Sequence, residues 1–133
     1  MLEEAMRLAK DVAMRAHAPY SQFPVGCVIV DENDQMHVGC NVENASYGLT
    51  MCAERNATGS AISAGAERFK TIVVASRKAV TPCGACRQVL AEFSSHDTEV
   101  FLIDLDGRQR EQHLLSHLLP HQFKLESDSK PQA

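Results

Sequence analysis

The sequence predicts a single α/β domain in which a mixed β-sheet is sandwiched by helices. Two helical patterns alternate with apolar, strand-like runs, and a hairpin pattern precedes them. The chain has 133 residues and 44% hydrophobic content, which is enough for one core. Residues 1–123 are expected to form the domain, and the polar residues 124–133 are expected to form a flexible C-terminal tail.

The first third of the chain predicts a helix followed by a hairpin. The helix ends before Pro19, and its apolar residues are spaced by three and four: Leu2, Ala5, Ala9, Val12 and Ala16. Residues 25–30 are continuously apolar, which is typical of a strand covered on both faces. Turn-forming residues at 31–34 lead into a returning strand. Its alternation over 36–43 places Asn41 and Glu43 on the same face at the strand's end.

The remaining elements alternate between helix and strand. Small residues at helical spacing predict a second helix from Cys52 to Gly65. Residues 71–76 read as a buried strand, after which Thr81 is a predicted helix cap and Pro82 the first residue of a third helix. Another strand at 100–103, a tight turn at 106–107, a polar edge strand at 108–113 and a short leucine-rich helix complete the fold.

Composition narrows the classes of function. The net charge is -4 and the basic residues are scattered, so a nucleic-acid partner is not favoured. We expect no membrane partner and a cytoplasmic location, because neither a leader nor a long apolar run is seen. Five cysteines do not make a closed disulfide framework, so clustered thiols point to a metal or catalytic site.

Three of the cysteines lie at predicted helix starts. Cys52 begins the second helix, and Cys83 and Cys86 lie in the first turn of the third. Helix N-termini lower thiol pKa values, and thiolate is the form that binds metal. Three sulfur ligands leave one tetrahedral position of zinc open, which is typical of a catalytic site. Glu54, in the same turn as Cys52, is the candidate general acid/base.

Other interpretations of these residues remain open. Cys83 and Cys86 alone resemble a redox pair, and a fourth ligand from a loop would make the zinc site structural. A glutamate in the first turn of a helix is commonly there for the helix dipole, and Asn41 and Glu43 are equally compatible with a capped strand end.

Longer motifs carry a resemblance to a known family. The segments are Tyr20–Gly26, Gly39–Asn44, Cys52–Arg55 and Pro82–Val89. Together they resemble the small homotetrameric zinc-dependent cytidine deaminases, from about Leu8 to Phe123. The resemblance implies a five-stranded mixed sheet flanked by helices. It also implies hydrolytic removal of the 4-amino group of cytidine and deoxycytidine, a reaction of pyrimidine salvage.

The resemblance also implies a role for each matching residue. Cys52, Cys83 and Cys86 are zinc ligands, and Glu54 is the proton shuttle. Arg55 balances the negative charge of the three thiolates. The substrate contacts are Phe23, Asn41, Glu43, Ala53 and Phe123, of which Phe123 is contributed to a neighbouring subunit's active site. The partners implied are a free nucleoside and three further copies of the chain, with one zinc ion per chain.

Related classes of function share parts of this pattern. Deaminases of nucleoside antibiotics or of bases within nucleic acids use the same zinc motifs, and a zinc-stabilised binding module needs only the cysteines. Cys27 and Cys40 are interpreted as small buried residues without a function.

Overall fold

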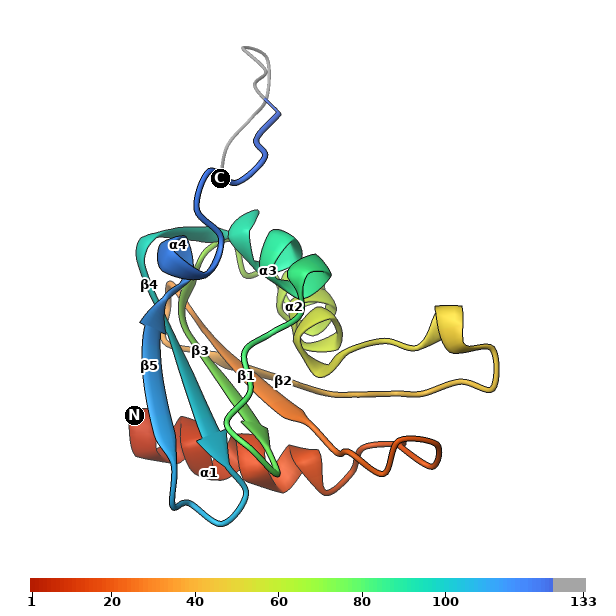
Figure 1. Ribbon diagram of the computed structural model, residues 1–133. Coiled ribbons are helices and arrows are strands. Elements are labelled where there is room, and N and C mark those ends of the chain that lie inside the picture. Colours follow the sequence, from red (N-terminus) through yellow and green to blue (C-terminus); the bar gives the residue numbers. More distant parts are fainter. Residues whose placement is uncertain (126–133) are drawn as a thin grey trace.

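The protein, seen in a computed structural model that describes residues 1–125, has a five-stranded sheet between two helical layers (Figure 1). The helices are α1 (Leu2–Ala13), α2 (Ala53–Ser63), α3 (Gly84–Ala91) and α4 (Leu115–Leu118), and Tyr47–Leu49 forms the 3-10 turn η1. The strands are β1 (Gly26–Asp31), β2 (Met36–Cys40), β3 (Phe69–Ser76), β4 (Ser94–Asp104) and β5 (Arg110–Leu114). Their order is β2-β1-β3-β4-β5. Only β3 and β4 are parallel, so the mixed sheet predicted from the sequence is confirmed.

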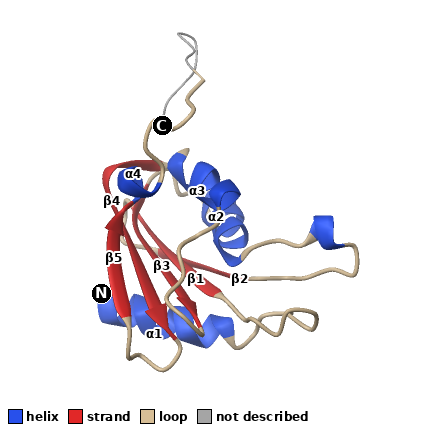
Figure 2. Cartoon of the chain, in the orientation of Figure 1, coloured by secondary structure: helices blue, strands red, loops and turns tan. Residues whose placement is uncertain are grey.

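The helices cover opposite faces of the sheet. Figure 2 shows α1 on one side and α2, α3 and α4 on the other. Alternate residues of β1 supply the two cores, because successive side chains of a strand point to opposite faces. Val28 and Val30 pack in the core under α1, whereas Cys27 and Ile29 pack in the core under α2. The continuous apolar run in β1 therefore reflects burial on both faces.

Two glycines allow the helices to approach the sheet closely. A Cβ atom built at Gly39 in β2 would lie 2.3 Å from the backbone nitrogen of Ala57 in α2. A Cβ atom built at Gly26 in β1 would lie 2.1 Å from the carbonyl oxygen of Ala9 in α1. The small residues predicted on the second helix also allow close packing. Ala53, Ala57 and Ala61 are fully buried. The position of α2, whose N-cap is Cys52, is thus fixed by backbone contact with β2.

Several predicted boundaries are wrong. The first helix ends at Ala13 and excludes Ala16, because the next three N–H groups bond to carbonyls only three residues back, as in a 3-10 turn. The third helix begins at Gly84, not at Pro82, because Cys83 replaces Thr81 as the cap and its Sγ accepts the N–H of Cys86 at 3.4 Å. Strands β3 and β4 begin earlier than predicted, at Phe69 and Ser94, because these two residues pair with each other before a shift in the register of the ladder.

The end of the chain is described only in part. Residues 124 and 125 have no regular structure, and the rest of the predicted flexible tail, residues 126–133, lies outside the described residues. The polar strand predicted at 108–113 is β5, at Arg110–Leu114, and it lies at the edge of the sheet. Across residues 1–125, no helix is both long and apolar enough to cross a bilayer.

A buried carboxylate holds the hairpin between β1 and β2. Asp31 is 3% exposed, and its side chain accepts the N–H groups of Asn33 and Gln35 and contacts His37 Nε2 at 2.8 Å. Burial raises the pKa of Asp31, but the hydrogen bonds from His37, Gln35 and Asn33 outweigh it and leave the pKa below its ordinary value. The ionised form therefore stabilises the fold.

Asp31→Asn is expected to lower the free energy of unfolding by about 2 kcal/mol at pH 7, because charged hydrogen bonds become neutral. A depressed folded-state pKa gives stability that is present above the unfolded pKa, about 3.9, and is lost as the pH falls through the folded value. Urea unfolding should therefore show that the free energies of unfolding of wild type and Asp31→Asn converge as the pH falls below about 4. Zinc loss in acid affects both proteins and cancels in the difference.

The matched control is Asp34→Asn in the same turn. Asp34 has an exposed ion pair with Lys70, so its loss should cost less than about 1 kcal/mol. Equal destabilisation by the two variants, or a difference between Asp31→Asn and wild type that does not shrink as the pH falls below about 4, would contradict the role given to Asp31.

Candidate active site

Three thiols meet where α2 and α3 begin. Cys52 is the N-cap of α2, Cys83 is the N-cap of α3, and Cys86 lies in the first turn of α3. Their sulfur atoms all lie within 4.8 Å of one another. The crossover from β3 to β4 contains α3, so the fold of the sheet places two helix N-termini side by side. The structure thus brings together the three cysteines that the sequence singled out.

The thiol group fits a tetrahedral metal ion with one open position. Sulfur atoms held about 2.3 Å from one tetrahedral zinc ion lie about 3.8 Å apart. Cys83 Sγ and Cys86 Sγ are already 3.3 Å apart. Within residues 1–125, no fourth cysteine, histidine or acidic side chain joins the group. The arrangement matches a catalytic zinc site better than a closed structural one.

The charges around the thiols favour thiolate at Cys52. A hydrogen bond from Cys86 and the Arg55 guanidinium lower the pKa of Cys52 to about 5, although burial opposes this. Arg55 donates from its terminal NH2 group to Cys52 Sγ at 3.4 Å. The hydrogen bond to Cys52 and burial raise the pKa of Cys86, because two facing thiols resist ionising together without a cation. A divalent cation would remove that conflict.

Glu54 lies beside this group and is shielded from solvent. It occupies the first turn of α2 and is 6% exposed. Burial raises its pKa to about 7, and the neighbouring Cys52 thiolate adds to the shift while Arg55 opposes it. A carboxyl group with a pKa near neutrality can both accept and donate a proton at physiological pH. This property distinguishes Glu54 from a solvated glutamate at a helix start.

Comparison with known proteins decides the family. The family described as "Cytidine and deoxycytidylate deaminase zinc-binding region" matches residues 1–102. The chain belongs to this zinc-binding deaminase family. Cytidine deaminase of Sporosarcina psychrophila is 40% identical over 127 residues, which are 94% of this chain and 93% of that protein. The Halalkalibacterium halodurans cytidine deaminase is 45% identical over 113 residues, covering 84% and 85%.

Solved structures agree with the family assignment. The crystal structure of cytidine deaminase from Burkholderia pseudomallei superposes with a TM-score of 0.87 at 40% identity, covering 92% of this chain and 99% of that one. Cytidine deaminase from Mycobacterium tuberculosis gives a TM-score of 0.81 at 33% identity, covering 93% and 98%. The protein is therefore a hydrolase of the zinc-binding deaminase family, with zinc as its cofactor and the thiol group as the site that fits it.

Asn41 and Glu43 lie just beyond β2, so the prediction that they share a strand face is wrong. The strand ends at Cys40, after which Val42 forms isolated bridges to His17 and Met51. The Asn41 amide donates to Phe23 O and accepts the N–H of Val25, both at 2.9 Å. It therefore ties the end of β2 to the loop before β1, and one donor hydrogen remains free.

Glu43 is held by the same loop. One carboxylate oxygen accepts the backbone N–H groups of Tyr20 and Ser21 at 2.9 and 3.1 Å, and the other accepts the Ser21 hydroxyl. The Ser21 hydroxyl is the main reason why the pKa of Glu43 lies below its ordinary value. A carboxylate offers about four lone-pair positions, so about one remains for an external hydroxyl group.

The three remaining predicted substrate contacts, Ala53, Phe23 and Phe123, lie in different parts of the fold. Ala53 is fully buried at the start of α2 beside Cys52. Phe23 is half-buried, and its ring lies 5.3 Å from the guanidinium carbon of Arg77. Phe123 lies beyond α4 with 71% of its surface exposed, and its backbone carbonyl accepts from Gln88 at 3.3 Å.

Sequence reasoning missed several side chains beside Glu43. Tyr20, Ser21, Glu43, Tyr47 and Thr50 line a cavity of about 400 Å³. The rings of Tyr20 and Tyr47 meet edge to face, with centroids 5.8 Å apart. Tyr20 and Tyr47 come from separate loops, so neither periodicity nor spacing joins them. The only sequence signal for these two tyrosines was that they lie in or near the segments Tyr20–Gly26 and Gly39–Asn44.

Arg55→Gln is expected to weaken zinc binding by about 10- to 100-fold, because the ligand thiolate loses its charged hydrogen bond. Arg55 Nε is buried without a hydrogen-bond partner among the described residues. Competition with a zinc-sensitive dye measures the affinity. Arg55→Lys should recover much of it, and the exposed Arg15→Gln should have no effect. Wild-type affinity in Arg55→Gln would remove Arg55 from the charge balance.

Proposed function

We propose that this chain hydrolyses cytidine and deoxycytidine to uridine and deoxyuridine, releasing ammonia. The observation that carries the proposal is a buried glutamate with a pKa of about 7 beside three thiols that fit zinc with one open position. Relatives 40% and 45% identical are named cytidine deaminase, which supports the same substrate class. We place the reaction in pyrimidine salvage in the cytoplasm and the catalytic domain at residues 1–123.

Glu54 performs the proton transfers in this proposal. When bound, zinc makes a water molecule acidic enough to act as a nucleophile near neutral pH. The Glu54 carboxylate accepts the proton of the attacking water and delivers it to the ring nitrogen, which makes C4 more electrophilic. It then takes the proton of the hydroxyl group that the attack has placed on C4 and passes it to the amine, which leaves as ammonia while the C4 carbonyl of the product forms. Burial keeps the pKa of Glu54 at about 7, so the carboxyl group can both accept and donate a proton near neutral pH.

The loops around β1 and β2 hold the nucleoside. Asn41 and Glu43 bind the ribose hydroxyls with the hydrogen-bonding capacity that the loop at 20–25 leaves unused. Phe23 and Ala53 contact the base. Arg77 stabilises the Phe23 ring through a cation–π contact. A free nucleoside suits this site better than a base in a nucleic acid, because the net charge of -4 does not attract a polyanion.

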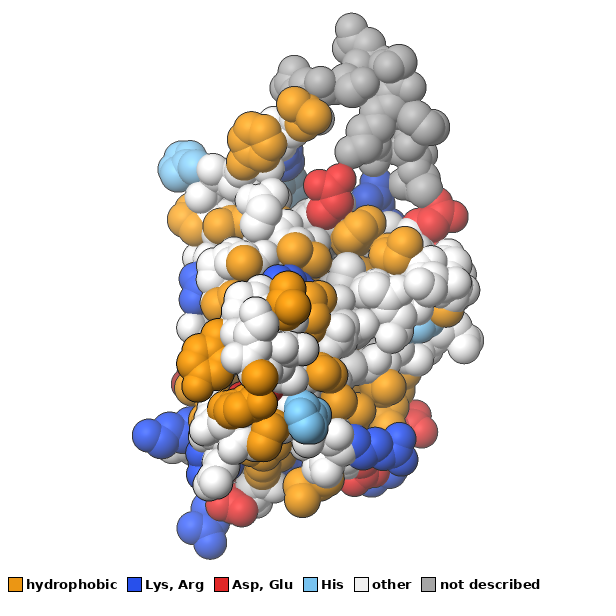
Figure 3. All heavy atoms as spheres, turned by 90° about the vertical axis from the view of Figure 1, so that its right-hand side faces the viewer, with side chains coloured by type: hydrophobic (Ala, Val, Ile, Leu, Met, Phe, Trp, Pro, Cys, Tyr) orange, Lys and Arg blue, Asp and Glu red, His pale blue; other side chains and the backbone are white. Residues whose placement is uncertain are grey.

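The catalytic unit in this proposal is a homotetramer with active sites between subunits. Exposed apolar side chains gather over the loops around η1, on the face shown in Figure 3. They are Tyr20, Val42, Tyr47, Leu49 and Met51, with exposed fractions from 37% to 74%. Apolar surface of this kind favours burial against another protein. Phe123, also exposed, would then reach the active site of a neighbour.

One set of assays tests the substrate and the chemistry. The purified protein is incubated with cytidine, deoxycytidine, cytosine and adenosine, while ammonia release and zinc per chain are measured. We expect deamination of the two cytidine nucleosides only. Deamination of adenosine but not cytidine would refute the substrate assignment. A zinc-loaded protein that releases no ammonia would indicate a structural zinc module.

Sedimentation velocity tests the assembly. A 14.6 kDa chain should sediment as a tetramer, and Tyr47→Ser should shift it toward smaller species and raise the KM for cytidine. A fully active monomer would refute the shared active site.

A further inference from the structure

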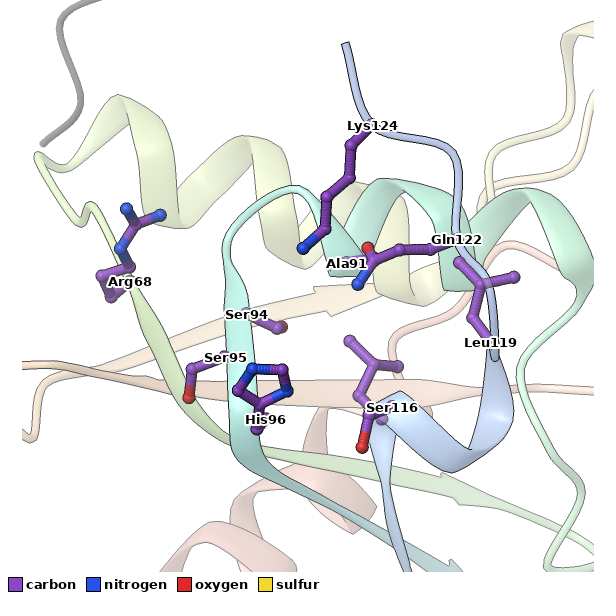
Figure 4. Close-up of a pocket in the computed structure, with 10 residues that line it drawn as sticks. Arg68, Ala91, Ser94, Ser95, His96, Ser116, Leu119, Gln122 and Lys124 are labelled. Atoms are coloured by element: carbon purple, nitrogen blue, oxygen red, sulfur yellow. The ribbon is translucent and has the colours of Figure 1, made fainter. Parts of the chain in front are cut away.

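A second hollow, of about 290 Å³, lies beside α4 at the far end of α3 (Figure 4). Ala91, the last residue of α3, lines it, whereas Cys83 caps the first turn of the same helix. A helix of eight residues is about 12 Å long, so the hollow is separate from the thiol group. No step of the proposed deamination uses it.

Basic side chains from three separate segments line the hollow. Arg68 precedes β3, His96 belongs to β4, and Lys124 follows α4. In Figure 4, Lys124 extends from the last described turn of chain into the space above His96. None of the three forms an ion pair within residues 1–125, and no described aspartate or glutamate lines the hollow. In a chain of net charge -4, a hollow lined by basic and not acidic side chains favours an anion.

Neutral hydrogen-bond donors surround the basic groups. Ser95 Oγ accepts the N–H of Asp97, which leaves its own hydrogen free. The side chains of Ser116 and Gln122 have no hydrogen-bond partner in the part of the chain that the structure describes. Hydroxyl and amide donors combined with arginine and lysine are the groups that bind phosphate oxygens. The set is therefore better suited to a phosphate group than to a carboxylate alone.

The size and the walls of the hollow limit the ligand. Ligand sites usually measure about 300–1,000 Å³, so this one suits a small molecule. Leu115 and Leu119 add apolar side chains to the lining. A phosphate group with a short organic substituent matches both surfaces.

We propose that this hollow binds a small phosphate monoester, held by Arg68 and Lys124. The bound ligand would also order the chain around Phe123, because Gln122 and Lys124 on either side of Phe123 both line the hollow. Gln88 of α3 already holds the Phe123 carbonyl at 3.3 Å. The effect on catalysis rests on the proposed function, in which Phe123 serves a neighbouring active site. Binding of the phosphate monoester does not depend on the proposed function.

Isothermal titration calorimetry with glycerol 3-phosphate and with inorganic phosphate tests the site in the full zinc-loaded protein at fixed ionic strength. Arg68→Gln and Lys124→Gln should each weaken binding by about tenfold, the value of one charged hydrogen bond. Lys70→Gln removes the same charge outside the hollow, where Lys70 pairs with Asp34, and should leave binding unchanged. Binding that is absent, or equal in all four proteins, would overturn the site. Thermal unfolding confirms that the variants fold.

Cytidine kinetics test the link to Phe123. Saturating glycerol 3-phosphate should lower the KM for cytidine about fivefold in wild type and leave Arg68→Gln unaffected. Where the change in KM reflects the affinity for the nucleoside, linkage requires a bound nucleoside to tighten phosphate binding by the same factor. An unchanged KM with proven binding would overturn the link, and zinc per chain is measured to exclude metal loss. Calorimetry needs no deaminase activity, so failure of this site and failure of the proposed function are distinguishable.

Discussion

Glu54→Gln is expected to lower kcat for cytidine by about 10²–10⁴-fold while the protein keeps its zinc. Glutamine preserves the shape of the side chain, but its amide cannot accept and return a proton. Glu54 is 6% exposed, so solvent is poorly placed to substitute for it. Removing a buried acid also leaves the three thiols unchanged, which separates proton transfer from metal binding.

Steady-state kinetics and zinc analysis of the same preparation measure this result. The control is Glu4→Gln, because Glu4 is also an acidic residue in the first turn of a helix but is exposed on α1. It should have wild-type kcat and KM. A Glu54→Gln enzyme of normal activity would end the proposed mechanism. Low activity accompanied by zinc loss would instead assign Glu54 to the metal site.

Cys86→Ser is expected to abolish zinc binding at micromolar zinc and to reduce deamination to background. Serine is a poor zinc ligand because its hydroxyl does not ionise near neutral pH, and two remaining thiols do not complete the site. Cys86 is fully buried in the first turn of α3, and a zinc ion held by Cys52, Cys83 and Cys86 would link the starts of α2 and α3, so the variant would lose that link. The melting temperature should therefore stop responding to added zinc.

Zinc per chain, activity and melting temperature are compared before and after treatment with a chelator. Wild type should lose activity on chelation and regain it when zinc is restored, whereas Cys86→Ser should respond to neither step. Cys40→Ser is the control, since Cys40 is only half-buried and lies outside the thiol group. Retention of one zinc per chain by Cys86→Ser would show that the metal is bound elsewhere.

The free thiol at Cys27 illustrates what local pattern predicts well. Its apolar neighbours predicted a small buried residue, and it is fully buried in the core under α2. The same prediction for Cys40 was wrong, because Cys40 is only half-buried near the end of the edge strand β2. Burial raises the pKa of Cys27 well above its ordinary value, so it stays protonated. The same kind of pattern predicted β1, the helix at 53–63 and the polar edge strand β5.

Boundaries were harder to predict because they depend on contacts with distant residues. Cys83 caps α3 with a sulfur atom, which capping preferences do not anticipate, so the predicted cap at Thr81 was wrong. Strand β2 ends at Cys40 because Val42 bridges to His17 and Met51, which are far from it in sequence. Asn41 and Glu43 are therefore both held by the loop at 20–25, and strand alternation does not place them.

The sequence by itself determined the chemistry of the site, because ligand type and spacing are local properties. Cys83 and Cys86 share one turn, and Cys52 and Glu54 share another. Only the tertiary structure decided that the two turns meet with three sulfurs within 4.8 Å, and that Glu54 is buried enough for its pKa to reach about 7. Distance and desolvation depend on the packing of α2 against β2 and α3, which no single segment encodes.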